Sequence, residues 1–167
     1  MNEPSATERL NGAASAWAEA VRRVLLAATA PAGSQRRIVA VAPDFEAWPW
    51  EAGELPSALA PWLRRPGREL VILLADPAAW LARSPRFDTW RRDWMHAIRI
   101  RALSEDEGGR LPEFIAAEGG PWARLQERDP WRGFAGADAR TATQLLQSID
   151  AQLQRSSPAG AVKVLGL

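Results

Sequence analysis

Apolar positions along the first half of the chain predict helices alternating with buried strands. Residues 5–30 carry apolar side chains at close to every third or fourth position, including Leu10, Trp17 and Val21, which is typical of a helix with one buried face. Short apolar runs at 38–42 and 70–75 predict strands. The second run is apolar throughout, as in strands covered on both faces. Residues 54–65, stopped by Pro66 and Gly67, predict the helix between them.

The pattern continues with a broken helix and a strand that has one polar face. Residues 77–95 predict a helix in two pieces, broken near Pro85. Residues 97–102 alternate apolar and basic side chains, which favours a strand with one face in solvent. This succession of strands and helices predicts a parallel core sheet joined by right-handed crossovers.

In the remainder of the chain, the segments that predict strands and loops are shorter. Residues 104–110 are acidic and glycine-rich, which predicts a loop. Residues 114–117 and 122–126 predict a hairpin, and 133–136 predict another loop. Asp138 is expected to cap a last helix to about residue 154.

These elements predict one α/β domain over residues 1–167. It comprises an N-terminal helix at about 5–30, an α/β core at about 36–155 and a tail at 156–167. We expect a mixed sheet of about five strands, a parallel core plus a hairpin, with helices on both faces.

Composition excludes several classes of protein. The chain has no cysteine and a single histidine, His96, so disulfides, thiolate metal sites and a cysteine nucleophile are excluded. Its apolar runs are far shorter than the roughly 20 residues of a membrane span, so we expect no span and a cytoplasmic protein. The nine tryptophans and absence of tyrosine make the chain tryptophan-rich, with most tryptophans expected as anchors of a core or an interface.

Basic residues suggest one candidate binding surface. The chain has 21 basic and 20 acidic residues, so it exerts little long-range attraction on nucleic acid. Arg99 and Arg101 fall on one face of their predicted strand. With Arg91 and Arg92 upstream, they form a candidate patch for nucleic acid or a phosphorylated ligand. The alternative is a solvated sheet edge whose arginines pair with the acidic loop.

Candidate catalytic groups are sparse. Asp44 and Asp76 each follow a predicted parallel strand at its carboxyl end, where open α/β sheets bind ligands. Both also suit ordinary turns, and a metal-dependent enzyme needs more carboxylates converging there. Because the chain lacks the glycine motifs for phosphate or dinucleotide binding and a serine elbow, we expect no cofactor and no resident metal.

The order of elements resembles one half of the phospholipase D-like fold, and also a little-characterised bacterial family with that half-fold. The resemblance runs from about residue 7 to 157. It rests on the strand at Ile38, the segments 70–76 and 98–101, the strand at Phe114, and Trp131-Arg-Gly133 before the last helix.

The resemblance implies where a catalytic signature belongs. The family signature is H-x-K-x-x-x-x-D, in which histidine attacks phosphorus, lysine holds phosphate oxygens and aspartate supports the site. The matching frame here begins at Leu111, with Glu113 at the lysine position and Glu118 at the acidic position. Leucine cannot attack phosphorus and glutamate repels the anion. The only lysine, Lys163, lies in the tail.

The leading hypothesis is therefore a non-catalytic half-domain, a pseudoenzyme acting as a binding or assembly module. Because half-domains of the resembled family pair to complete a site, the resemblance also implies a homodimer. The first alternative is weak binding of nucleic acid or a phosphorylated ligand through the arginine patch. The second is a carboxylate- and metal-dependent enzyme using Asp44 and Asp76.

Overall fold

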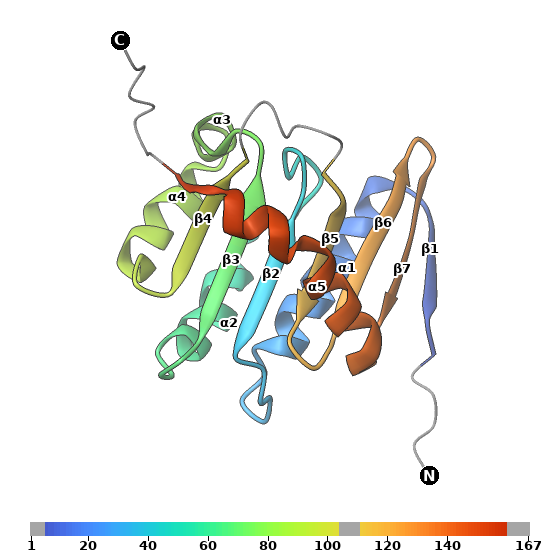
Figure 1. Ribbon diagram of the computed structural model, residues 1–167, viewed down its shortest axis with the longest axis horizontal. Coiled ribbons are helices and arrows are strands. Elements are labelled where there is room, and N and C mark those ends of the chain that lie inside the picture. The colour runs from blue at the N-terminus through green and yellow to red at the C-terminus, as the bar shows by residue number, and fades with distance from the viewer. Residues whose placement is uncertain (1–5, 104–110, 160–167) are drawn as a thin grey trace.

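The protein is organised around one mixed sheet (Figure 1). A computed structural model describes residues 6–103 and 111–159. Within them, eight strands follow the order β1-β7-β6-β5-β2-β3-β4-β8. The prediction of an α/β fold is confirmed, whereas the prediction of about five strands was too low because it missed strands at both ends of the sheet.

The parallel core lies where the apolar runs predicted it. It consists of β2 (Arg37–Val41), β3 (Glu69–Leu74) and β4 (Ile98–Ala102). In its register, Ile38 lies beside Leu70, and Leu70 lies beside Ile98, so the three strands begin at the same level. Their amino ends therefore form one edge of the sheet, and their carboxyl ends form the opposite edge.

The antiparallel half contains two of the three missed strands, β1 and β7. The hairpin of β5 (Glu113–Ala117) and β6 (Trp122–Arg128) is confirmed. It continues into β7 (Trp131–Gly136), where a loop was predicted. Gly133 gave that segment the composition of a loop, but a Cβ there would lie 2.5 Å from the Arg124 carbonyl oxygen, so close strand pairing requires glycine.

The first residues of the predicted N-terminal helix instead form β1 (Glu8–Gly12), which pairs with β7. Leu10 is the only buried residue of this strand, and its spacing from the following apolar residues imitates the helical period. The strand ends at Gly12, whose φ of +115° a helix does not permit. The helix α1 follows over Ala14–Ala28.

Helices cover both faces of the sheet, as predicted. One face packs against α1, α2 (Glu54–Leu63), α3 (Pro77–Ala82) and α4 (Pro85–Arg91), which is followed by the short helix η1 (Arg92–Trp94). The other face packs against α5 (Ala139–Arg155), which crosses the sheet diagonally in Figure 1. Asp138 caps α5 as predicted, its carboxylate accepting the Thr141 N–H.

After α5, a two-residue strand, β8 (Ser157–Pro158), pairs with β4. The rest of the predicted tail, residues 160–167, and the predicted loop 104–110 lie outside the described residues. No helix in the described part of the chain is long and apolar enough to cross a membrane.

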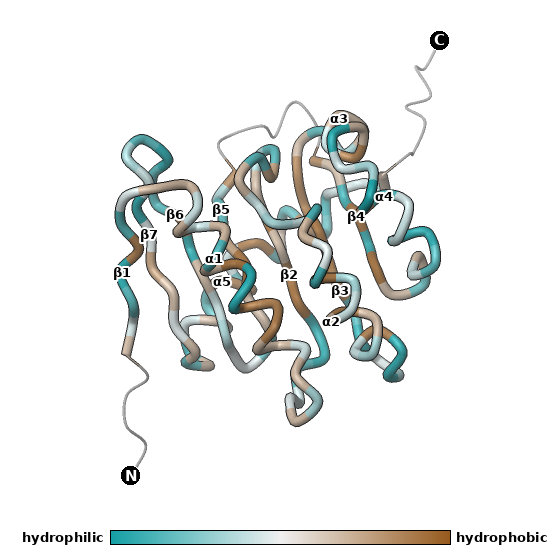
Figure 2. The backbone as a smooth tube through the Cα atoms, turned by 180° about the vertical axis from the view of Figure 1, so that it is seen from behind, coloured by the Kyte–Doolittle hydropathy of each residue, from teal (hydrophilic) through white to brown (hydrophobic). Residues whose placement is uncertain are grey.

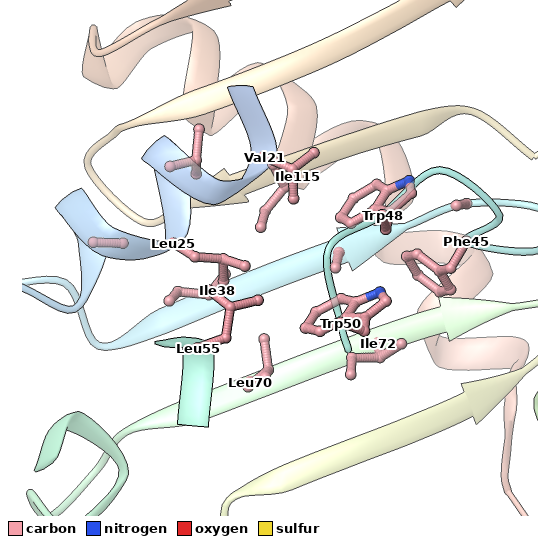
Figure 3. Packing of buried hydrophobic residues seen from close by; sticks show 14 of the residues in the cluster. Val21, Leu25, Ile38, Phe45, Trp48, Trp50, Leu55, Leu70, Ile72 and Ile115 are labelled. Carbon is pink, nitrogen blue, oxygen red and sulfur yellow. The ribbon is translucent and has the colours of Figure 1, made fainter. Parts of the chain in front are cut away.

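The larger core lies between the sheet and the helices that begin with α1. Figure 2 shows hydrophobic colouring along the central strands and on α1. Trp48 and Trp50, in the loop after β2, stack 5.9 Å apart over this core beside Phe45 (Figure 3). Both tryptophans are buried, which confirms their expected role as packing anchors.

Candidate functional site

A buried carboxylate lies at the start of β5. The Glu113 side chain is only 7% exposed. One of its oxygens accepts the indole N–H of Trp48 at 2.8 Å, and the other accepts Nε of Arg128 at 2.9 Å. These two donors satisfy a charge that would otherwise be costly to remove from water.

Arg128, at the end of β6, also binds a second carboxylate. Its two terminal nitrogens donate to the two oxygens of Asp44 at 2.8 and 3.1 Å. Glu46 lies further away, at 3.8 Å. These contacts, with the Asp44 bonds foremost, raise the pKa of the Arg128 guanidinium above its ordinary value. The same hydrogen bonds from Arg128 are the main reason that the pKa of Asp44 is lowered.

The sheet topology brings these residues together. Because β5 is antiparallel to both β2 and β6, its start lies near the carboxyl ends of those strands, with Phe114 beside Val41 and Glu113 beside Leu125. Asp44 follows β2, and its carboxylate also accepts the Glu46 N–H, which fixes the turn. Trp48 is held by edge-on contacts with Trp17 and Phe45. We call Asp44, Trp48, Glu113 and Arg128 the carboxyl-end cluster.

A groove of about 770 Å³ opens beside this cluster. Its walls come from the segment before β5 and from the end of β6. They include Leu111, Pro112, Glu113, Leu125, Arg128 and Asp129. Leu111 and Glu113 therefore share one cavity. Two arginines also line it: the exposed Arg124, and Arg128, whose hydrogen-bond donors already serve Glu113 and Asp44.

The third position of the predicted frame lies elsewhere. Glu118 follows β5 at its other end, where its backbone N–H donates to the Arg37 carbonyl at 2.9 Å. Its side chain is exposed, and among the described residues it makes no ion pair. The structure thus brings Leu111 and Glu113 together and separates Glu118 from them by the length of the strand.

The four arginines of the predicted patch do not form one surface. Arg91 and Arg92 both pair with Asp88, at 2.7 and 3.0 Å, within the helical layer of α4. Arg99 and Arg101 share a face of β4, as predicted, but this is the face that α5 covers elsewhere in the sheet. Arg99 pairs with Glu69, and Arg101 donates to Ser156.

The two strand-end aspartates have structural partners. Asp44 binds Arg128, and Asp76 caps α3 by accepting the Ala79 N–H at 3.0 Å. Within the described ranges, no three histidine or acidic side chains gather as metal ligands would. Both aspartates lie at strand carboxyl ends as expected, and each is bonded to its own partner in the fold.

Two features escaped the sequence analysis. Arg128 belongs to no recognisable sequence motif, because its partners Glu113 and Asp44 lie 15 and 84 residues away along the chain. A group of arginines at the amino ends of the parallel strands was also missed. Its signal is visible in the doublets Arg36-Arg37 and Arg64-Arg65, each followed closely by a strand that starts at the same edge of the sheet.

Comparison with known proteins identifies the fold. No protein-family model and no curated protein matches the chain. Among solved structures, Nuc from Salmonella typhimurium, a phospholipase D family member, superposes with a TM-score of 0.53 at 13% identity, over 93% of this chain and 98% of Nuc. NucT from Helicobacter pylori gives a TM-score of 0.54 at 9% identity, over 93% of this chain and 99% of NucT.

A DNA-binding protein shares the same fold. TrmBL2, an archaeal chromatin protein described as having a novel mode of DNA binding, gives a TM-score of 0.59 at 13% identity. The match covers 94% of this chain and 55% of TrmBL2, so the chain spans little more than half of that protein's length. The described residues thus have a phospholipase D-like fold, as the order of elements predicted.

Proposed function

We propose that this chain is a non-catalytic phospholipase D-like half-domain that acts as a binding module. The observation that carries the proposal is the closed ion-pair arrangement of Glu113. In the frame implied by the resemblance, Glu113 occupies the lysine position, and its carboxylate is buried and bonded to Trp48 and Arg128. A phosphate ligand needs positive charge at that point, and the chain supplies a negative one.

The groove beside Glu113 offers no replacement for the missing chemistry. Leu111 has no nucleophilic atom at the histidine position. Arg124 on the groove wall cannot act as a nucleophile, and a phosphate group would have to displace two carboxylates to reach the donors of Arg128. Glu118 keeps an acidic group at the third position, yet it lies at the other end of β5. The degenerate frame thus supports the absence of phosphodiesterase activity.

Hydrolysis assays test this proposal directly. We expect the purified chain to hydrolyse neither bis(p-nitrophenyl) phosphate nor single-stranded DNA above the buffer rate, with and without magnesium or manganese. Hydrolysis that disappears in a folded Arg128→Gln variant would place chemistry in the groove and overturn the proposal. Hydrolysis that persists in this variant at full rate would point to a contaminating enzyme, which repurification removes.

The proposal includes a single domain that assembles as a homodimer in the cytoplasm. One continuous sheet contains every described strand, which supports a single domain over residues 1–167. The resemblance supports the dimer, because half-domains of that family pair. Light scattering at high micromolar concentration is expected to give twice the chain mass of 18.3 kDa, and a strict monomer would refute the dimer.

A second candidate function is binding of nucleic acid or another phosphorylated ligand. The likeness to a DNA-binding chromatin protein favours it, together with the arginines that lie outside the carboxyl-end cluster. Of the predicted patch, Arg99 is exposed and lines a pocket together with Arg64, Arg65 and Arg68. Fluorescence anisotropy with labelled DNA should show binding that weakens with salt. No binding at low salt, or no change in Arg99→Ala/Arg101→Ala, would argue against this candidate.

A further inference from the structure

The amino ends of the parallel strands form a pocket lined by positive charge. Its volume is about 400 Å³, and it lies between the end of α2 and the starts of β3 and β4. The charged and titratable residues that line it are Arg64, Arg65, Arg68, Glu69, His96 and Arg99. We call this the amino-end pocket. It lies at the opposite edge of the sheet from the carboxyl-end cluster.

Specific contacts build this pocket from separate segments. The Trp62 indole N–H donates to the Gln35 carbonyl at 2.9 Å, which ties the end of α2 to the residues before β2. Arg65 donates to the Gly33 carbonyl at 3.2 Å. Gly67 adopts a φ of +73°, which turns the chain back from α2 into β3. These contacts bring Arg36 close to Arg65 and Arg68.

Positive charge in this region exceeds negative charge. Glu69 is shared by Arg37 at 3.6 Å and Arg99 at 2.7 Å. The remaining arginines of this region are Arg36, Arg64, Arg65 and Arg68, and none pairs with a carboxylate among the described residues. The exposed Glu118, which follows β5 beside Arg37, is a further carboxylate at this edge. A chain with a net charge of +1 therefore concentrates several unpaired cations at one end.

Arg68 shows that these charges are held under repulsion. Its Nε atom is buried and has no hydrogen-bond partner within the described residues. Burial is the main cause that lowers the pKa of its guanidinium, and the nearby charges of Arg65 and Arg36 lower it further. An anion in the pocket would offset the charge of Arg68 that burial and the neighbouring arginines disfavour.

We propose that the amino-end pocket binds a compact, multiply charged phosphate ligand, with inorganic pyrophosphate as its simplest probe. Guanidinium groups match the oxygens of phosphate in geometry and remain charged at neutral pH. The concave shape and limited volume suit a compact anion, whereas a polymer backbone requires a longer basic track. Arg64 is held near the pocket by its contact with the Trp94 ring, 5.8 Å from the ring centroid. This inference rests on the proposed function, because it gives the binding module a ligand class.

Calorimetric titration of the full chain with sodium pyrophosphate at low ionic strength tests the site. We expect saturable binding, weakened at least about tenfold in Arg65→Gln/Arg68→Gln, because each charge-assisted hydrogen bond contributes on the order of a factor of ten. The matched control is Arg9→Gln, which removes one exposed arginine from β1 at the far side of the sheet. It should bind as tightly as the wild type.

Three results would overturn the inference. They are absence of binding to the folded wild-type chain, unchanged affinity in Arg65→Gln/Arg68→Gln, and equal losses in that variant and in Arg9→Gln. A competition experiment with a single-stranded oligonucleotide completes the test. Displacement of the oligonucleotide by pyrophosphate supports the compact site, and tight oligonucleotide binding that pyrophosphate does not displace contradicts it. Phosphodiester hydrolysis by the same samples would contradict the proposed non-catalytic function. The pyrophosphate titration would still decide separately whether the amino-end pocket binds an anion.

Discussion

Arginine occurs at both ends of the central strands, in two different surroundings. Beyond the carboxyl end of β2, Arg128 donates to Glu113 and to Asp44, so each charged member of the carboxyl-end cluster has a partner. At the amino ends of β2 and β3, Arg36 and Arg68 have no carboxylate partner within the described residues. The same residue type thus stabilises the fold at one edge, and at the other it leaves donors free for an outside anion.

This contrast separates the site that the fold resemblance implies from the site that we propose. The resemblance implies chemistry beside Leu111 and Glu113, where the ion pairs leave little capacity for a ligand. Unmatched positive charge has accumulated at the opposite edge, for which the resemblance implies nothing. The site that the fold resemblance implies and the anion site that we propose thus lie at opposite ends of the strands.

Removing the cation from the carboxyl-end cluster should have the largest effect. Arg128→Met keeps an unbranched apolar stem but leaves the buried Glu113 carboxylate without its charged partner. We expect a loss of about 3 kcal/mol in the free energy of unfolding, which is typical when one partner of a buried ion pair is removed. Urea denaturation followed by tryptophan fluorescence measures this loss.

Two variants test whether the loss of stability comes from leaving the buried Glu113 carboxylate without a charged partner. Glu113→Gln/Arg128→Met removes both charges and should recover part of the stability. Arg132→Met removes an exposed arginine whose nearest carboxylate, Glu127, lies 3.7 Å away, and it should change the unfolding free energy by less than about 0.5 kcal/mol. A loss of similar size in Arg128→Met and Arg132→Met would mean that Glu113 is not a buried charge.

The next largest change in the free energy of unfolding should come from adding pyrophosphate, which we propose binds the amino-end pocket. Pyrophosphate at roughly 100 times its dissociation constant should add about 2.7 kcal/mol to the free energy of unfolding, because it binds only the folded chain. Thermal denaturation with and without pyrophosphate measures the effect. Arg65→Gln/Arg68→Gln should lose most of it and Asp44→Asn should retain it, whereas the reverse ranking would place the anion at the carboxyl-end cluster.

Acid should weaken the carboxyl-end cluster selectively. Since Arg128 lowers the pKa of Asp44 in the folded chain, Asp44 adds stability above its unfolded pKa of about 3.9. That contribution disappears as the pH falls through the lower, folded pKa. Urea midpoints measured from pH 6 to about pH 2.5 should therefore fall less steeply in Asp44→Asn than in the wild type. Parallel curves for the two proteins would show that the Asp44–Arg128 pair adds nothing to stability.

The sequence predicted the elements whose periodicity is strong and local. The apolar run of β3 and the Asp138 cap of α5 are both present where expected. The strand β7 was missed because Gly133 and Gly136 replace the alternating side chains that normally mark a strand. The carboxyl-end cluster could not be predicted, because its contacts depend on how β2, β5 and β6 are ordered in the sheet. The clustering of the amino-end arginines could have been predicted from the sequence, since parallel strands place their starts side by side.

The smallest expected effect has the opposite sign from that of Arg128→Met. Arg68→Met keeps an apolar stem of similar length and removes a charge that lies near Arg65 and Arg36 and pairs with no carboxylate among the described residues. Without ligand, the urea midpoint should rise slightly, because like charges no longer repel and no buried Nε lacks a partner. Arg22→Met is the control, because Arg22 pairs with Glu19 and Glu54 and its loss should lower the midpoint slightly. A lower midpoint in Arg68→Met would show that Arg68 stabilises the unliganded fold, and the two edges of the sheet would then use arginine in the same way.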